Sequence, residues 1–292
     1  MPVRHLLLVL LICLAWAGNF LTSAAALQHL PPFLFTALRL GLVALLLWPW
    51  LRRPPAGQWP RLIAISLCSG AFHFGFSFWA IQLAGNLASP AIVTQSYVPM
   101  TALLAVIFLG ERFGWRTGLG IAVSFAGILV LGFDPLVLAA PNSLLLMLLS
   151  SLLLATGTVM LRGLKGMHPF NQQVWSALIG IVPLLAISYG FEHGQVAALK
   201  AAPWVAWVGV AYAAIFASAL GHGLFYWLVQ RYPVSQVTPY LLITPVFAVA
   251  LGIAFWGDRP GPRLWLGGAM VLGGVLAIAL RARTKNRVVP VP

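Results

Sequence analysis

Three side chains that could carry charge lie inside long apolar stretches of this 292-residue chain: Arg39, His73 and His222. An arginine near the middle of a bilayer costs at least about 2.5–3.5 kcal/mol on insertion scales, so a functional role is the first hypothesis for it. Arg39 could bind a solute carboxylate, but it could equally snorkel to the membrane surface or cap the carbonyls of a broken helix. The histidines are the only side chains there that could titrate near neutral pH.

All four acidic residues lie outside these apolar stretches. They are Glu111, Asp134, Glu192 and Asp258. Because proton and sodium relays in membranes use buried carboxylates, their absence favours facilitated diffusion or loosely coupled exchange. It also disfavours multivalent cations as solutes, which would need a buried countercharge. A sugar phosphate would need more than one buried cation, and only Arg39 qualifies.

Two prolines interrupt apolar stretches beside polar side chains. They are Pro99, which follows Gln95 and Tyr97, and Pro245, which follows Tyr240 and Thr244. A proline inside a helix frees a backbone carbonyl, which a neighbouring group, a water or a ligand can use. These polar residues could therefore line a solute pathway. Alternatively, they could form interhelical hydrogen bonds worth about 0.6 kcal/mol on average.

Aromatic residues form a further set of candidates for the pathway, because rings offer stacking and a large contact area to planar apolar solutes. The candidates are Trp16 with Asn19 nearby, Phe76, Trp79, Trp175 and Tyr226. Trp79 has a counterpart, Trp227, in the second half of the chain. These two tryptophans could instead anchor the protein at opposite membrane surfaces.

The composition requires lipid as the solvent for most of the chain. Hydrophobic residues make up 61% and charged residues 7%, with a mean hydropathy of +0.96, whereas soluble proteins are about a quarter charged. The net charge of +13 comes from dispersed residues, which argues against nucleic-acid binding. Cys13 and Cys68 show no metal-ligand spacing, and we expect neither a metal nor a cofactor.

The apolar stretches are continuous and about 20 residues long, which predicts an all-α integral membrane protein. The expected helices cover residues 5–26, 32–51, 60–83, 88–109, 115–133, 142–162, 169–191, 203–230, 235–256 and 263–280. The first stretch also imitates a cleavable signal peptide, but we expect it to remain as a helix. Thirteen of the 17 Lys and Arg residues fall at one side of this arrangement and three at the other, which predicts cytoplasmic termini.

The chain repeats itself. The sequence Gly110-Glu111-Arg112 returns 147 positions later as Gly257-Asp258-Arg259. This repeat predicts two similar halves, residues 1–135 and 136–292. Five helices per half is an odd number, so the second half must run in the opposite sense around a central cavity. Inverted repeats are typical of secondary transporters, with the solute near the membrane midplane. The glycine-rich fifth and tenth helices could form a scaffold or a subunit contact in a homo-oligomer.

These features resemble the drug/metabolite transporter superfamily, in its ten-helix branch with two EamA domains. The resemblance is carried by Pro90, Pro99, Gly110-Glu111-Arg112, Gly120 and Gly127, by their second-half counterparts from Pro239 to Gly274, and by Trp16-Ala17-Gly18-Asn19 and Arg39. It implies efflux of a small metabolite through a bacterial inner membrane. At finer grain the chain looks similar to the YddG-type exporters of aromatic amino acids.

The expected function is therefore export of aromatic or other neutral amino acids by alternating access. Aliphatic amino acids, purines and cationic drugs stay open as alternative solutes. A membrane enzyme would need paired titratable groups at one interface, and Glu111 and Asp258 are expected on opposite sides. A channel would be expected to show rings of like polar residues instead of one duplicated helix pair.

Overall fold

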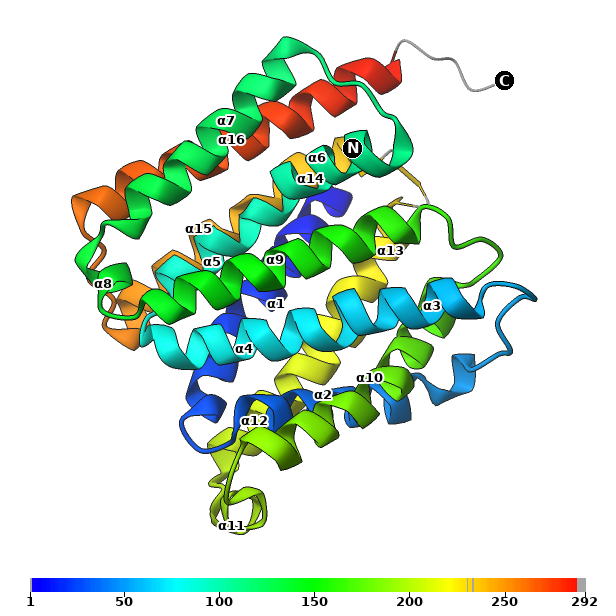
Figure 1. The fold of residues 1–292 in the computed structure, drawn as a ribbon, viewed down its shortest axis with the longest axis vertical. Coiled ribbons are helices and arrows are strands. Elements are labelled where there is room, and N and C mark those ends of the chain that lie inside the picture. The colour runs from blue at the N-terminus through cyan, green and yellow to red at the C-terminus, as the bar shows by residue number, and fades with distance from the viewer. Residues whose placement is uncertain (1, 230, 233, 288–292) are drawn as a thin grey trace.

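The computed structural model describes residues 2–229, 231–232 and 234–287. Within this part of the chain the regular structure is entirely helical. Ten helical segments are long and apolar enough to cross a membrane. Figure 1 shows them as one bundle in which the start of α1 and the end of α16 lie at the same end. The expected all-α membrane fold is therefore confirmed.

The first half of the chain supplies five of these segments. They are α1 (Val3–Leu27), α2 with η1 (Pro32–Leu47, Trp48–Trp50), α3 with η2 and α4 (Trp59–Ile65, Ser66–Phe72, His73–Ala84), α5 with η3 and α6 (Ala88–Val93, Thr94–Ser96, Tyr97–Leu109), and α7 (Trp115–Gly132). A short helix, α8 (Pro135–Leu138), leads into the second half.

The second half supplies the other five. They are α9 (Pro141–Leu161), α10 (Pro169–Phe191), α12 with η4 and α13 (Trp204–Tyr212, Ala213–His222, Gly223–Val229), α14 with α15 and η5 (Val234–Leu241, Ile243–Leu251, Gly252–Trp256), and α16 (Pro262–Arg287); the short α11 (Gln195–Ala201) precedes α12. Each expected stretch corresponds to one segment. The last helix continues past the expected residue 280 to Arg287, beyond its apolar part.

Three spanning segments contain π-helical stretches, η2, η4 and η5, and the first two lie at matching places in the two halves. The first, η2, begins at Ser66, and the second, η4, begins at Ala213, which is 147 residues later and equals the offset of the sequence repeat. His73 directly follows η2, and His222 is the last residue of η4. A π-helical insertion widens the helix locally and is frequent at functional sites. The two stretches therefore mark corresponding points in the two halves.

The prolines also interrupt their segments in the same way. In the first half the chain tightens into the 3₁₀ turn η3 just before Pro99, and in the second half Leu242 separates α14 from α15 just before Pro245. Both irregularities lie about one turn before the proline, where its missing N–H and its ring disturb the helix. The helix is therefore irregular beside the prolines at both places where the sequence predicts a freed backbone carbonyl.

Helices α7 and α16 cross in contact through four glycines. A Cβ atom on Gly127 would lie 2.6 Å from the carbonyl oxygen of Gly267, and one on Gly267 would lie 2.5 Å from that of Gly127. Gly120 and Gly274 form an equivalent reciprocal pair, at 2.9 and 2.5 Å. The helices are therefore antiparallel and their backbones touch. The glycine-rich helices form an internal contact between the two halves.

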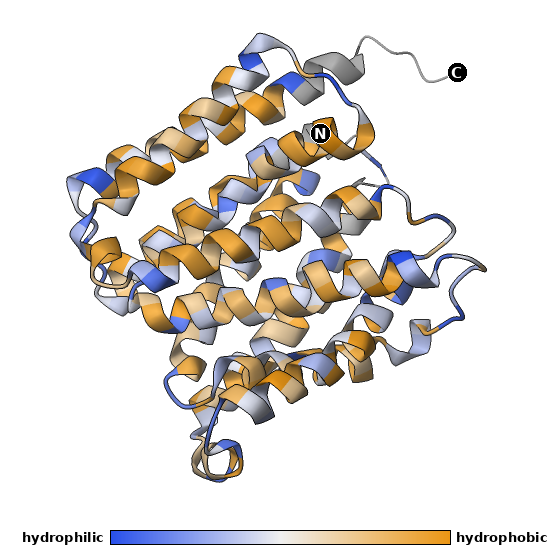
Figure 2. Cartoon of the chain, viewed as in Figure 1, coloured by the Kyte–Doolittle hydropathy of each residue, from blue (hydrophilic) through white to orange (hydrophobic). Residues whose placement is uncertain are grey.

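The bundle has two polar ends and an apolar middle. Figure 2 shows hydrophobic residues along the helices and strongly hydrophilic residues mainly in the connections at the two ends. We call the end that holds the start of α1 and the end of α16 the terminal face. The opposite end, which holds Asp134, Glu192 and Asp258, is the carboxylate face.

Candidate solute-binding site

Arg39 lies inside the bundle, about 10 Å along α2 from the start of that helix at a rise of 1.5 Å per residue. Its side chain is only 2% exposed. Nε and Nη2 both donate to the hydroxyl oxygen of Ser218, at 3.3 and 2.9 Å. The guanidinium carbon lies 3.8 Å from the centre of the Phe74 ring and 5.4 Å from that of Phe78. Arg39 therefore points inward and does not snorkel.

Ser218 belongs to the π-helical stretch η4 and connects several of the polar groups. Its hydroxyl accepts from Arg39 and donates to the carbonyl oxygen of Ala213 at 2.7 Å. The side-chain amide of Gln173, on α10, donates to the carbonyl oxygen of Ser218 at 3.4 Å. One serine therefore joins α2, α10 and η4 in the interior of the bundle.

Trp16 and His222 lie beside this serine. The indole N–H of Trp16 donates to the carbonyl oxygen of Ala217 at 3.0 Å, so α1 also contacts η4. The Trp16 ring centre is 5.3 Å from that of His222 and 6.0 Å from that of Phe225. Three residues further along α1, Asn19 accepts a hydrogen bond from Ser23.

His73 also contacts Phe74, with ring centres 4.7 Å apart. Its Nδ1 is 2.8 Å from the hydroxyl and 3.0 Å from the carbonyl oxygen of Ser150, on α9, and the hydroxyl also donates to the His73 carbonyl. Arg39 contacts the same Phe74 ring as His73, and His222 belongs to η4 together with Ser218, the hydrogen-bond partner of Arg39. The structure therefore brings Trp16, Arg39, His73 and His222 into one region. We call these four residues, with Phe74, Gln173 and Ser218, the central cluster.

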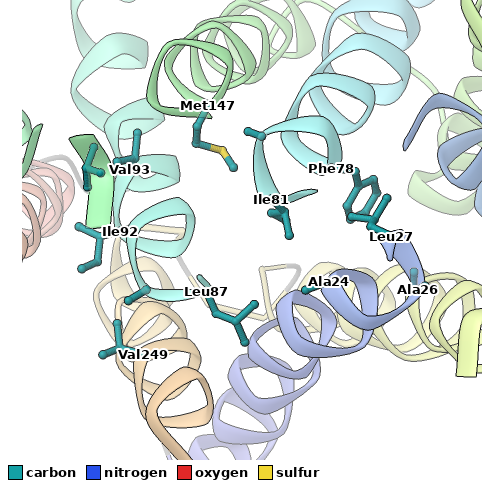
Figure 3. Close-up of a cluster of buried hydrophobic side chains, with 14 of the residues drawn as sticks. Ala24, Ala26, Leu27, Phe78, Ile81, Leu87, Ile92, Val93, Met147 and Val249 are labelled. Atoms are coloured by element: carbon teal, nitrogen blue, oxygen red, sulfur yellow. The ribbon is translucent and has the colours of Figure 1, made fainter. Parts of the chain in front are cut away.

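An apolar cluster lies between the central cluster and the carboxylate face. Figure 3 shows its side chains converging from α1, α4, α9, α15 and the region of α5. The labelled members are Ala24, Ala26, Leu27, Phe78, Ile81, Leu87, Ile92, Val93, Met147 and Val249. Phe78 belongs to this cluster and also faces Arg39. The apolar cluster therefore directly adjoins the central cluster.

A recess of about 550 Å³ lies on the other side of this apolar cluster. Its lining comes from both halves of the chain: Ala24, Leu27, Gln28, Ile81, Gln82, Gly85, Phe255 and Trp256. The Gln82 amide donates to the carbonyl oxygen of Leu27 at 2.7 Å, and the Trp256 indole donates to that of Gly85 at 3.2 Å. Ala24, Leu27 and Ile81 belong to both the lining and the apolar cluster, so they form the floor of the recess.

Every acidic side chain of the protein is engaged away from the central cluster. At the carboxylate face, Glu192 accepts from the backbone N–H groups of Phe33 and Leu34 at 2.7 and 3.1 Å. Asp258 accepts from those of Leu87 and Ala88, both at 2.9 Å. Each of these carboxylates in the second half therefore caps the first turn of a helix in the first half, where the helix dipole favours negative charge.

The remaining two acids are engaged in different ways. Asp134 accepts from the N–H of Leu264 in the first turn of α16 at 2.9 Å, which again connects the two halves. Glu111 forms an ion pair with Arg162 at the terminal face, where both side chains are 49% exposed. Arg39 therefore has no carboxylate partner, because the chain contains only these four acids.

Several other predicted residues lie outside the central cluster. Phe76 and Trp79 pack on Phe33 of α2, with ring centres 5.9 and 5.8 Å away. Trp79 is 37% exposed, in agreement with an anchoring role near the carboxylate face. Trp175 lies at the terminal face, where its indole donates to the Arg52 carbonyl and its ring meets Trp59.

The residues around the prolines form a separate region. Pro99, Thr244 and Pro245 are buried, whereas Gln95 and Tyr97 are half-buried. Tyr240 is 37% exposed, and its carbonyl oxygen faces the Cys13 thiol of α1 at 3.6 Å. The side chain of Tyr226 lies outside the described part of the structure. These residues stay candidates for a pathway, and none of them is seen to contact Arg39.

Replacing Trp16 with phenylalanine is expected to weaken solute binding, whereas the same change at Trp175 leaves it unaltered. Trp16→Phe removes an N–H group that donates to the π-helical stretch beside His222, and a neutral hydrogen bond contributes about 1 kcal/mol, or roughly fivefold in affinity. Trp175 makes an equivalent indole bond, but at the terminal face. Half-saturation concentrations in reconstituted vesicles measure both effects. An equal loss in the two variants would contradict the assignment of Trp16 to the site.

The chain has ten membrane-crossing segments, repeated irregularities in its two halves and a polar cluster with residues from both halves. These features define the class of multi-pass membrane transporters. The model of the EamA-like transporter family matches residues 3–133 and 142–280. The chain belongs to this family.

Similar proteins occur in several bacteria. The uncharacterized protein PA1977 of Pseudomonas aeruginosa is 32% identical over 94% of both chains. A probable amino-acid metabolite efflux pump of Salmonella typhimurium is 28% identical, over 93% of this chain and 91% of its own. A probable terminal-alkyne amino-acid exporter of Streptantibioticus cattleyicolor is 27% identical, over 82% and 80%. A solved crystal structure has the same fold, with a TM-score of 0.64 at 19% identity over 98% of this chain and 99% of that one.

Proposed function

We propose that this transporter exports neutral amino acids, aromatic ones among them, across the bacterial cytoplasmic membrane without strict coupling to an ion gradient. The names of the Salmonella typhimurium and Streptantibioticus cattleyicolor relatives both concern amino-acid efflux. The single observation that carries the proposal is the chemistry of the central cluster. It combines one cation with aromatic rings and hydrogen-bonding groups, and all four acids are engaged at the ends of the bundle.

This chemistry favours a zwitterion over a cationic drug. A cation placed beside Arg39 would meet a like charge with no carboxylate nearby, which is costly in a medium of low polarity. An amino acid carries its own carboxylate, and its side chain could contact the rings of Trp16, Phe74 and Phe78. No group of three or more potential metal ligands occurs among the described residues, so the proposal involves no metal.

The proposed mechanism is alternating access between two inverted halves, residues 1–135 and 136–292. The reciprocal glycine pairs of α7 and α16 and the matched π-helical stretches support the internal symmetry. The distribution of Lys and Arg supports cytoplasmic termini, so we infer that the carboxylate face is external. Solute released to the outside would cross the apolar cluster into the recess beside Trp256 when the halves rock apart.

We expect uptake of a labelled amino acid into vesicles to be equal with and without an imposed pH gradient. The reason is that no carboxylate lies in the interior to relay a proton. The experiment uses purified protein in liposomes and compares phenylalanine, leucine, adenine and a quaternary ammonium drug by counterflow. Transport of the drug or the purine alone would refute the proposed solute class. Strict dependence of phenylalanine and leucine uptake on the gradient would refute the uncoupled mechanism.

A further inference from the structure

Two buried polar atoms at the central cluster have no hydrogen-bond partner among the described residues: Nη1 of Arg39 and Oε1 of Gln173. Nη1 carries two N–H donors, and Oε1 is an acceptor. Leaving such groups unpaired inside a protein costs free energy, so each unpaired group in a structure needs an explanation. Their side chains contact the same residue, Ser218, at its hydroxyl and at its carbonyl oxygen.

The unpaired donor is part of a permanent charge. The protein stabilises the Arg39 guanidinium through the Phe74 ring and Ser218 but supplies no anion. Cation–π contacts contribute less than full pairing of a desolvated ion requires. A carboxylate can accept two parallel hydrogen bonds from a guanidinium, which makes it the anion that fits this group best.

We propose that Arg39 and Gln173 form the subsite for the main chain of an α-amino acid. Nη1 of Arg39 donates to the carboxylate, and Oε1 of Gln173 accepts from the ammonium group. This inference rests on the proposed function and specifies which part of the solute the site recognises. The side chain of the solute is then left to the rings around the site, which explains how one subsite serves several neutral amino acids.

Access to this subsite depends on the conformation of the bundle. Arg39 is buried here, and Phe74 covers one face of its guanidinium. Arg39 comes from α2 in the first half, whereas Gln173 and Ser218 come from α10 and η4 in the second half. A relative movement of the halves therefore opens or closes the subsite, so that solute binding and the alternation of access become linked.

The test compares solutes that share one side chain but differ in the main-chain groups. The probes are phenylalanine, phenylalaninamide, which lacks the carboxylate, and 3-phenylpropionate, which lacks the ammonium group; leucine, leucinamide and 4-methylpentanoate form a second set. Competition against counterflow of the labelled amino acid measures their relative affinities. A charge-assisted hydrogen bond predicts that wild-type protein prefers the amino acid over the amide by roughly 10- to 100-fold. Equal competition by the amide in the wild type overturns the proposal without any variant.

Substitutions then assign each preference to its residue. Arg39→Gln should abolish the preference for phenylalanine over phenylalaninamide but leave the preference for phenylalanine over 3-phenylpropionate. Gln173→Leu should leave the first preference and abolish the second. Arg39→Lys keeps the charge, so it should retain part of the preference even if Arg39→Gln does not fold. Ser218→Ala is the control for a purely structural role, because it removes the acceptor of Arg39 but leaves the guanidinium.

The outcomes separate this inference from the proposed function. If Ser218→Ala loses the preference for a carboxylate as fully as Arg39→Gln does, then Arg39 acts by holding η4 and the subsite is wrong. If either Arg39 variant keeps the full wild-type preference, the subsite is also wrong, while amino-acid export stands. If the wild type carries neither phenylalanine nor leucine, the proposed function fails.

Discussion

Replacing Gly127 with alanine lowers the thermal stability of the protein sharply, whereas the same change at Gly273 leaves it nearly unaltered. A Cβ on Gly127 would lie 2.6 Å from the Gly267 carbonyl oxygen and 2.8 Å from the backbone nitrogen of Val271. Overpacking typically costs about 1–3 kcal/mol. The cost here should reach or exceed the upper end of that range, because backbone atoms cannot turn aside as a flexible side chain can.

Gly273 provides a matched control on the same pair of helices. It lies in α16 next to Gly274, but a Cβ atom there would have no neighbour within 4 Å. Alanine also has the better helix propensity, so Gly273→Ala should be neutral or slightly stabilising. The measurement is the melting temperature of each purified variant in detergent, with unfolding monitored as loss of the monodisperse peak. Equal melting temperatures for the two variants would show that α7 and α16 do not pack through these glycines.

Replacing Asp258 with alanine should also destabilise the protein strongly. Its carboxylate is the acceptor for the N–H groups of Leu87 and Ala88, two residues that are fully buried. A buried donor left without an acceptor costs about 1–3 kcal/mol, and this change creates two. Glu111→Ala is the control: its ion pair with Arg162 is half exposed, and such pairs contribute about 0–1 kcal/mol. Similar losses in both variants would contradict this account of Asp258.

The conservative variant Asp258→Asn separates the hydrogen bonds from the charge. It keeps an acceptor oxygen, so it should lose much less stability than Asp258→Ala. Burial raises the pKa of Asp258, although the two N–H donors oppose this shift. The folded protein therefore binds this proton more tightly than the unfolded chain, and the wild type gains stability as pH falls through the raised pKa. Relative to Asp258→Asn, its melting temperature should rise as the pH falls toward 3.8, the ordinary pKa of this side chain.

The fold could be predicted from the sequence because its main determinants are local. Lengths of apolar stretches determine the ten segments, and two of the segments are irregular just before a proline. The π-helical stretches could not be predicted, since no residue type between Ser66 and Phe72 or between Ala213 and His222 requires them. In η4, Ser218 contacts Arg39 of α2, which is a contact between distant parts of the chain that local sequence patterns do not reveal.

The candidate site could be predicted only in part, for a related reason. Arg39, His73 and His222 were recognisable because polar side chains are costly in lipid and therefore conspicuous. Ser218 and Gln173 gave no such signal, since serine and glutamine also occur in membrane helices for packing. Phe74 was one of several aromatic residues in its stretch, and only the packing places its ring over Arg39. Trp175 illustrates the opposite case, because its residue type suggested the pathway and the structure places it at the terminal face.

The capping of helices by acids at the carboxylate face has a consequence for the evolution of this transporter. Three of its four acids hold one half against the other, and the fourth joins two loops by an ion pair. None of these acids can take part in ion-coupled transport without losing the helix cap or ion pair that it now forms. A descendant that acquires energy coupling would therefore need either a new acidic residue that Arg39 tolerates as a neighbour, or a coupling role for the interior histidines, His73 and His222.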